Sequence, residues 1–88
     1  MLIQRNKIMK QKVIKLESRY KDIDSKLVQV EDNKYLLETN SEYVRLRRAE
    51  NSTIHSIDLE GGPMIRVGYT IQDKKIKSIK SQYVIEFE

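Results

Sequence analysis

The sequence lacks cysteine and tryptophan and has a single histidine, His55. Without cysteine the chain can form neither a disulfide scaffold nor a thiolate metal site, and one histidine is too few for most zinc centres. The sequence therefore predicts no metal site and no cofactor. Disulfides and metals are also the usual supports of small domains, so self-association is the route to extra stability that stays open.

Long apolar runs are missing as well. The N-terminal stretch MLIQRNKIMKQKVIKLE interrupts its apolar residues with polar or charged ones every two or three positions. It has no signal-peptide core of about 7 to 15 apolar residues, and no stretch approaches the roughly 18 apolar residues of a membrane span. Together with the absence of cysteine, this predicts a cytoplasmic protein with no membrane partner.

Catalytic motifs are absent too. No Gly-x-Ser-x-Gly elbow offers an exposed nucleophile, and His55 and Asp58 would point to opposite faces of one strand. We therefore expect a protein that is not an enzyme. The chain has 17 basic and 13 acidic residues among 88, and the resulting net charge of +4 favours anionic partners.

The first part of the chain shows a heptad pattern. No glycine or proline occurs from Leu2 to Val30, and apolar residues recur at alternating steps of four and three after Met9. This spacing predicts an amphipathic helix over residues 1–25 that pairs with a second copy as a coiled coil. The alternative is that the helix packs on its own domain. The expected oligomerisation residues are Asn6, Met9, Val13, Leu16, Tyr20 and Ile23.

The remaining residues, 26–88, change to a period of two, which is typical of strands. A hairpin is expected around Asp32-Asn33, followed by strands at 42–48, 54–59, 64–71, 75–80 and 82–88. The predicted fold is α+β, a single domain over 1–88 with one N-terminal helix and an antiparallel meander or small barrel of five to six short strands. In architecture alone this layout is similar to that of Sm-like RNA-binding proteins, whose sequence motifs are missing.

All three glycines and the only proline lie in GGPMIRVG, residues 61–68. Gly61-Gly62-Pro63 predicts a turn between two strands, and Gly68 predicts a bulge or bend within the strand at 64–71. A second interpretation of the turn is that the amides of Gly61 and Gly62 bind an anion such as phosphate, with Arg66 nearby.

The strand at 42–48 carries the main candidate binding surface. Alternation places Tyr43, Arg45 and Arg47 outward, where an aromatic ring and two guanidinium groups suit bases and phosphates, and Arg66 extends this surface if its strand lies nearby. We therefore expect a self-associating binding protein that recognises a nucleic acid or a nucleotide through these residues and the glycine turn. The alternative is a protein-binding inhibitor or adaptor, such as a phage-encoded accessory or anti-defence protein that acts on a host nucleic-acid enzyme.

Overall fold

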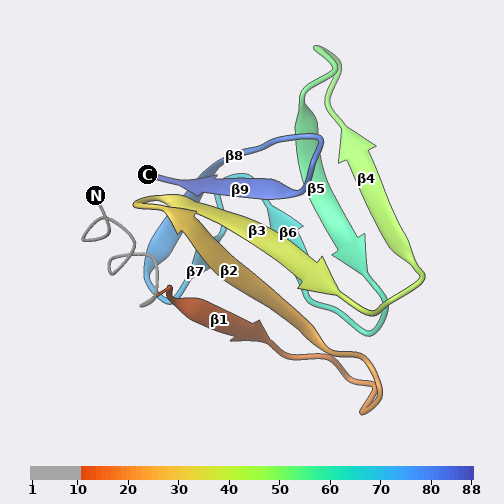
Figure 1. Cartoon of the computed structure of the whole chain (residues 1–88). Helices are drawn as coiled ribbons and strands as arrows, with labels where there is room; N and C mark the ends of the chain where they lie inside the picture. Colours follow the sequence, from red (N-terminus) through yellow and green to blue (C-terminus); the bar gives the residue numbers. More distant parts are fainter. Residues whose placement is uncertain (1–10) are drawn as a thin grey trace.

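The computed structural model describes residues 11–88, and these residues form nine β-strands in two antiparallel sheets (Figure 1). The strands are β1 (Val13–Leu16), β2 (Ser25–Glu31), β3 (Lys34–Thr39), β4 (Val44–Arg48), β5 (Ile54–Leu59), β6 (Met64–Arg66), β7 (Thr70–Ile71), β8 (Lys74–Ile79) and β9 (Val84–Phe87). Within this part of the chain no helix is long and apolar enough to cross a membrane.

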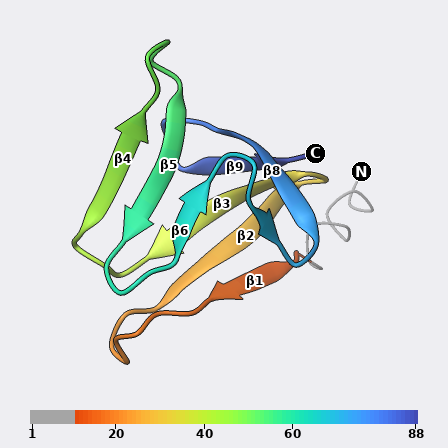
Figure 2. The same cartoon turned by 180° about the vertical axis from the view of Figure 1, so that it is seen from behind.

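Sheet A has six strands in the order β1-β2-β3-β9-β8-β7, and sheet B has three in the order β4-β5-β6. The two opposite views show how sheet A curls, so that β7 and β8 lie on the other side of the molecule from β2 and β3 (Figures 1 and 2). There β5 of sheet B contacts β8. The result is a curled half-barrel whose inner surface is the core.

The core consists of alternate residues from the strands of both sheets. In sheet A, Ile14 lies opposite Leu27 and Leu27 lies opposite Leu37, so one buried row crosses three strands. The rings of Tyr35 and Phe87, both fully buried, meet edge to face with their centroids 5.3 Å apart. The buried apolar residues are Ile14, Leu16, Leu27, Tyr35, Leu37, Ile54, Ile57, Leu59, Ile65, Ile76, Ile79, Ile85 and Phe87.

The predicted α+β fold is wrong for the described residues, because 11–88 contain no helix. Residues 13–16 form a strand that pairs with β2, residues 17–24 form a loop, and β2 begins at Ser25. The heptad pattern placed Val13 at the interface and left out Ile14, whereas Val13 is 55% exposed and Ile14 is 3% exposed. Alternation in Val-Ile-Lys-Leu, supported by hydrogen bonds to β2, outweighs the heptad spacing.

The coiled coil is therefore not supported, and its expected interface residues do not share a surface. Leu16 belongs to the core and Val13 faces outward, while Tyr20 and Ile23 lie in the β1–β2 loop. Asn6 and Met9 lie outside the described residues.

The strands expected after residue 26 coincide closely with those observed. The Asp32-Asn33 turn joins β2 and β3, with Glu31 opposite Lys34. The strand expected at 64–71 is interrupted by Gly68, which has a φ of 95° and donates its N–H to the Ile76 carbonyl at 2.9 Å. The bend expected at Gly68 thus separates β6 from β7 and returns the chain towards β8.

The pairing register of β1 predicts that Ile14 contributes more to stability than Val13, whereas a heptad helix would predict the reverse. Ile14→Ala should lower the free energy of unfolding by about 2–4 kcal/mol because it removes a buried side chain. Val13→Ala should cost less than about 1 kcal/mol because this side chain is mostly exposed. Urea denaturation of the two variants measures the difference, and a larger loss for Val13→Ala than for Ile14→Ala would contradict the strand.

Candidate functional site

Three arginines share the outer face of sheet B. In the register of its strands, Arg47 of β4 lies opposite Ser56 of β5, which lies opposite Arg66 of β6. Arg45 lies two residues before Arg47 and so points to the same side. Since paired strands lie about 4.8 Å apart, the Cα atoms of Arg47 and Arg66 are separated by roughly 10 Å. We call the surface formed by Arg45, Arg47 and Arg66 the arginine face.

The opposite side of sheet B explains why the arginines face outward. Leu46, Ile57 and Ile65 form the row between the two arginine rows, and all three pack in or against the core. Side chains alternate along a strand, so the neighbours of these apolar residues must point away from the core. Arg45 and Arg47 are exposed, as the sequence predicts.

An ion pair orients Arg47 on this face. Its Nε donates a hydrogen bond to Oδ2 of Asp58 at 2.8 Å; the Arg47 side chain is 52% exposed and the Asp58 side chain is 18% exposed. Because the bond uses Nε, both terminal nitrogens of the guanidinium remain for other acceptors. Asp58 lowers the positive charge of the face but fixes the direction of one of its donors.

Aromatic side chains border the arginine face on two sides. Tyr43 directly precedes β4 and Tyr69 follows β6, and each is 47% exposed. The guanidinium carbon of Arg66 lies 5.6 Å from the centre of the Tyr69 ring, which is cation–π distance. Unbroken alternation from Ile65 would place Tyr69 on the inner face, and the turn at Gly68 brings its ring beside Arg66 instead.

The glycine turn packs against the β1–β2 loop. The Arg19 N–H donates to the Gly61 carbonyl at 2.9 Å, and a Cβ atom on Gly61 would collide with the Ser18 hydroxyl and the Tyr20 ring. The Gly62 N–H donates to the Leu59 carbonyl at 3.0 Å. The Gly62 amide is therefore already bonded within the turn, and Gly61 contributes its carbonyl to the contact with the loop.

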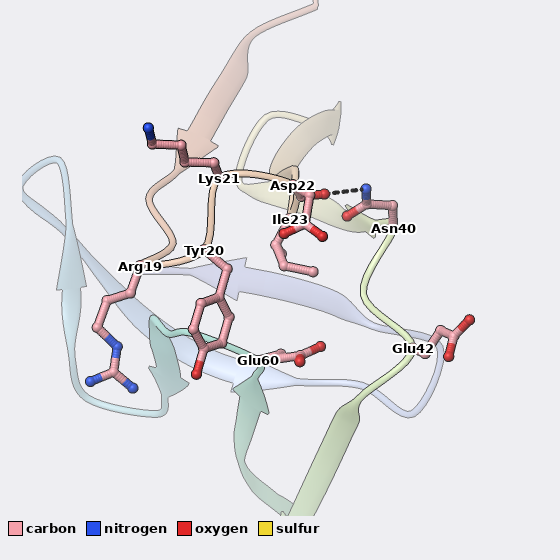
Figure 3. Close-up of a pocket in the computed structure, with 8 residues that line it drawn as sticks. All are labelled: Arg19, Tyr20, Lys21, Asp22, Ile23, Asn40, Glu42 and Glu60. Atoms are coloured by element: carbon pink, nitrogen blue, oxygen red, sulfur yellow. Dashed lines mark hydrogen bonds between the residues drawn. The ribbon is translucent and has the colours of Figure 1, made fainter.

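An open pocket of about 560 Å³ lies beside this turn (Figure 3). We call it the mixed pocket, because Asp22, Glu42 and Glu60 line it together with Arg19 and Lys21. Its other lining residues are Tyr20, Ile23 and Asn40. Three carboxylates against two cations make it a poor setting for an anion, so the candidate site rests on the arginine face and leaves Gly61 and Gly62 out.

Comparison of the chain with protein-family models, curated proteins and solved structures found no match. The chemistry of the site is therefore argued from its own residues. In the part of the chain that the structure describes, no group of three or more acidic or histidine side chains could hold a metal ion. What the arginine face offers is positive charge, guanidinium donors and exposed aromatic rings.

The packing around Gly61 predicts a graded effect of alanine substitution. Gly62→Ala should lower the free energy of unfolding by about 1 kcal/mol, because φ is 82° but the space around it is open. Gly61→Ala should cost about 1–3 kcal/mol more, since its Cβ also displaces Ser18 and Tyr20. Thermal and urea unfolding compare the two variants, and equal losses would show that the loop does not pack on the turn.

Proposed function

We propose that this protein binds nucleic acid through the arginine face, without catalysis and in the cytoplasm. Arg45, Arg47 and Arg66 contact phosphates, while Tyr43 and Tyr69 offer rings on which bases can stack. Guanidinium groups suit this role because their planar donors match phosphate oxygens in a bidentate manner.

The observation that carries the proposal is the register of sheet B, which gathers arginines distant in sequence. Arg47 and Arg66 are 19 positions apart in the numbering, yet they flank the same residue, Ser56. Only Asp58 counters their charge in the paired rows of the face. A net charge of +4 for the whole chain adds a general attraction to polyanions.

Fluorescence anisotropy with a labelled mixed-sequence oligonucleotide tests this function. The variant Arg45→Ala/Arg66→Ala removes two arginines and keeps the Arg47–Asp58 pair that supports the fold. We expect affinity to fall roughly tenfold and the slope of log K against log salt to shrink by about 1.4, because two phosphate contacts are lost.

The matched control is Arg19→Ala/Lys21→Ala, which removes the same charge from the mixed pocket. It should keep most of the affinity and nearly the full salt slope. Wild-type protein that binds neither single strand nor duplex at low salt rules the function out. Equal losses in the two double variants would mean that only net charge matters.

A second surface, on the outer side of sheet A, is a candidate interface for self-association. An aliphatic row crosses its outer face, with Val13 opposite Val28, Val28 opposite Leu36, and Leu36 opposite Val84. Val13 is exposed and the other three are partly exposed. Such a continuous row on an outer face is a candidate interface.

We propose that a second copy covers the aliphatic row. A two-fold axis parallel to the strands places Val28 of each copy opposite Leu36 of the other. The same operation brings Lys26 of each copy opposite Glu38 of the other, since these residues are directly paired within one sheet. The two faces are therefore complementary in charge as well as in apolar surface.

Sedimentation velocity over a range of concentrations tests this dimer. The wild-type mass should rise from 10.4 kDa towards twice that value, and Val28→Lys should keep the protein monomeric. Met64→Lys is the control, because it places the same charge at an exposed apolar site on sheet B. A wild-type monomer at every concentration, or the same effect from both variants, excludes dimerisation through sheet A.

A further inference from the structure

A groove of about 370 Å³ lies where one end of sheet B meets β8. One wall is the β4–β5 turn, from Arg48 to Thr53, and the other is the end of β8 with the turn that follows it. We call it the basic groove, since its charged lining residues are Arg48, Lys77 and Lys80. It lies at the opposite end of β5 from Glu60 and the mixed pocket.

The cations of the basic groove come from both walls. Arg48 stands on the sheet B side, where its Nη1 donates to the Ser52 carbonyl at 2.8 Å. This bond uses one guanidinium N–H and holds the remaining ones at the rim of the groove. Lys77 and Lys80 stand on the β8 side, and both are exposed. An anion between the walls can therefore be contacted from two directions.

Glu86 is an acidic group that interacts electrostatically with Lys77 and Lys80, and it does not line the groove. The Ser78 hydroxyl donates to its Oε1 at 3.0 Å, which is the main reason that the pKa of Glu86 is lowered. Desolvation opposes this shift and is the second-largest effect on the pKa, and Lys77, Lys34 and Lys80 each lower it by less. The carboxylate is thus charged near neutral pH and offsets part of the lysine charge, and the groove stays net positive.

The groove also has an apolar floor. Ile54, Val67 and Ile79 line it, contributed by β5, the chain after β6, and β8. Val67 is partly exposed, whereas Ile54 and Ile79 are each 5% exposed and present only a small part of their side chains. A site for a bare anion needs no such surface, whereas a nucleotide combines an anionic phosphate with an apolar base face. The lining therefore fits a nucleotide better than an inorganic ion.

The basic groove begins where the arginine face ends, on the other side of sheet B. Arg48 and Val67, which line the groove, directly follow Arg47 and Arg66, which form the last row of the face. Because neighbouring residues of a strand point to opposite sides, Arg48 and Val67 face away from Arg47 and Arg66, and a ligand on the arginine face reaches the groove by turning around this end of the sheet, as a flexible single strand can. One extended ligand can therefore occupy both surfaces.

We infer that the basic groove binds the phosphate and the unpaired base of one nucleotide, so that the ligand is single-stranded nucleic acid and not duplex. The inference rests on the proposed function, because the rest of the strand lies on the arginine face. The base must be unpaired, since a base held in a duplex cannot turn its face to Ile54, Val67 and Ile79.

Anisotropy with one labelled oligonucleotide, as a single strand and as a duplex, provides the first test. Wild-type protein should bind the single strand at least tenfold more tightly. Lys77→Ala/Lys80→Ala should lower single-strand affinity roughly tenfold and reduce the salt slope by about 1.4. The control Lys12→Ala/Lys75→Ala removes two exposed lysines outside the groove and should change affinity much less.

An NMR titration with a nucleoside monophosphate and with inorganic phosphate separates the two proposals. The nucleotide should shift signals of Arg48 and of the Ile54 and Ile79 methyl groups, and phosphate alone should leave the methyl signals in place. These shifts without oligonucleotide binding would support the groove and refute the proposed function. Three results would overturn the inference: equal affinities for duplex and single strand, equal affinities of Lys77→Ala/Lys80→Ala and its control, or no shift of the methyl signals with the nucleotide. In each case binding of nucleic acid to the arginine face could still stand.

Discussion

The burial of Ile57 between Leu46 and Ile65 fixes the register of sheet B, and the outer face of the sheet follows from it. Each buried aliphatic side chain contributes about 1.5–3 kcal/mol. A slip of one residue would expose this row and turn Arg45 and Arg47 towards the core. The position of the positive charge is thus a consequence of apolar packing on the other side of the same strands, and it needs no stabilising contact between the arginines themselves.

Strand β5 lies between the two arginine-bearing strands and also lines the basic groove, because its register changes near its start. Arg47 lies opposite Ser56, yet the next residue, Arg48, lies opposite Ile54, so one residue of β5 is left over between the two pairs. Directly opposed residues share a face, and Arg48 points away from Arg47. Ile54 is therefore turned inward, while Ser56 lies on the outer side between Arg47 and Arg66, where it is only 1% exposed. This bulge increases the local twist and ends the arginine face where the basic groove begins. A regular strand would have placed Ile54 on the outer surface.

Local signals in the sequence were sufficient for most of the β half. Asp32-Asn33 has turn chemistry, and the β-branched residues Ile54 and Ile57 mark the strand Ile54–Leu59. In residues 1–25 the spacing of apolar residues led to the wrong prediction of a helix, because steps of three and four also occur by chance in a strand followed by a loop. What decides between the two is pairing with β2, a contact that spacing within one segment cannot reveal. Ile14, which the heptad pattern omits and the core buries, was the one local sign against the helix.

The site was predictable only where it lies within single strands. Alternation places Arg45 and Arg47 outward, but the groove requires the β4–β5 turn to meet β8, and nothing local to Arg48 or Lys77 signals that meeting.

The net charge of the chain does not reveal how the charged side chains are distributed over the molecule. Three carboxylates and two cations line the mixed pocket, whereas the charged residues that line the basic groove are all cations, and the length of β5, roughly 20 Å, separates the two. At physiological salt the Debye length is about 8 Å, so each end acts on a ligand almost independently. A polyanion that crossed the arginine face would therefore meet the carboxylate of Glu60 at one end and the cations of the basic groove at the other.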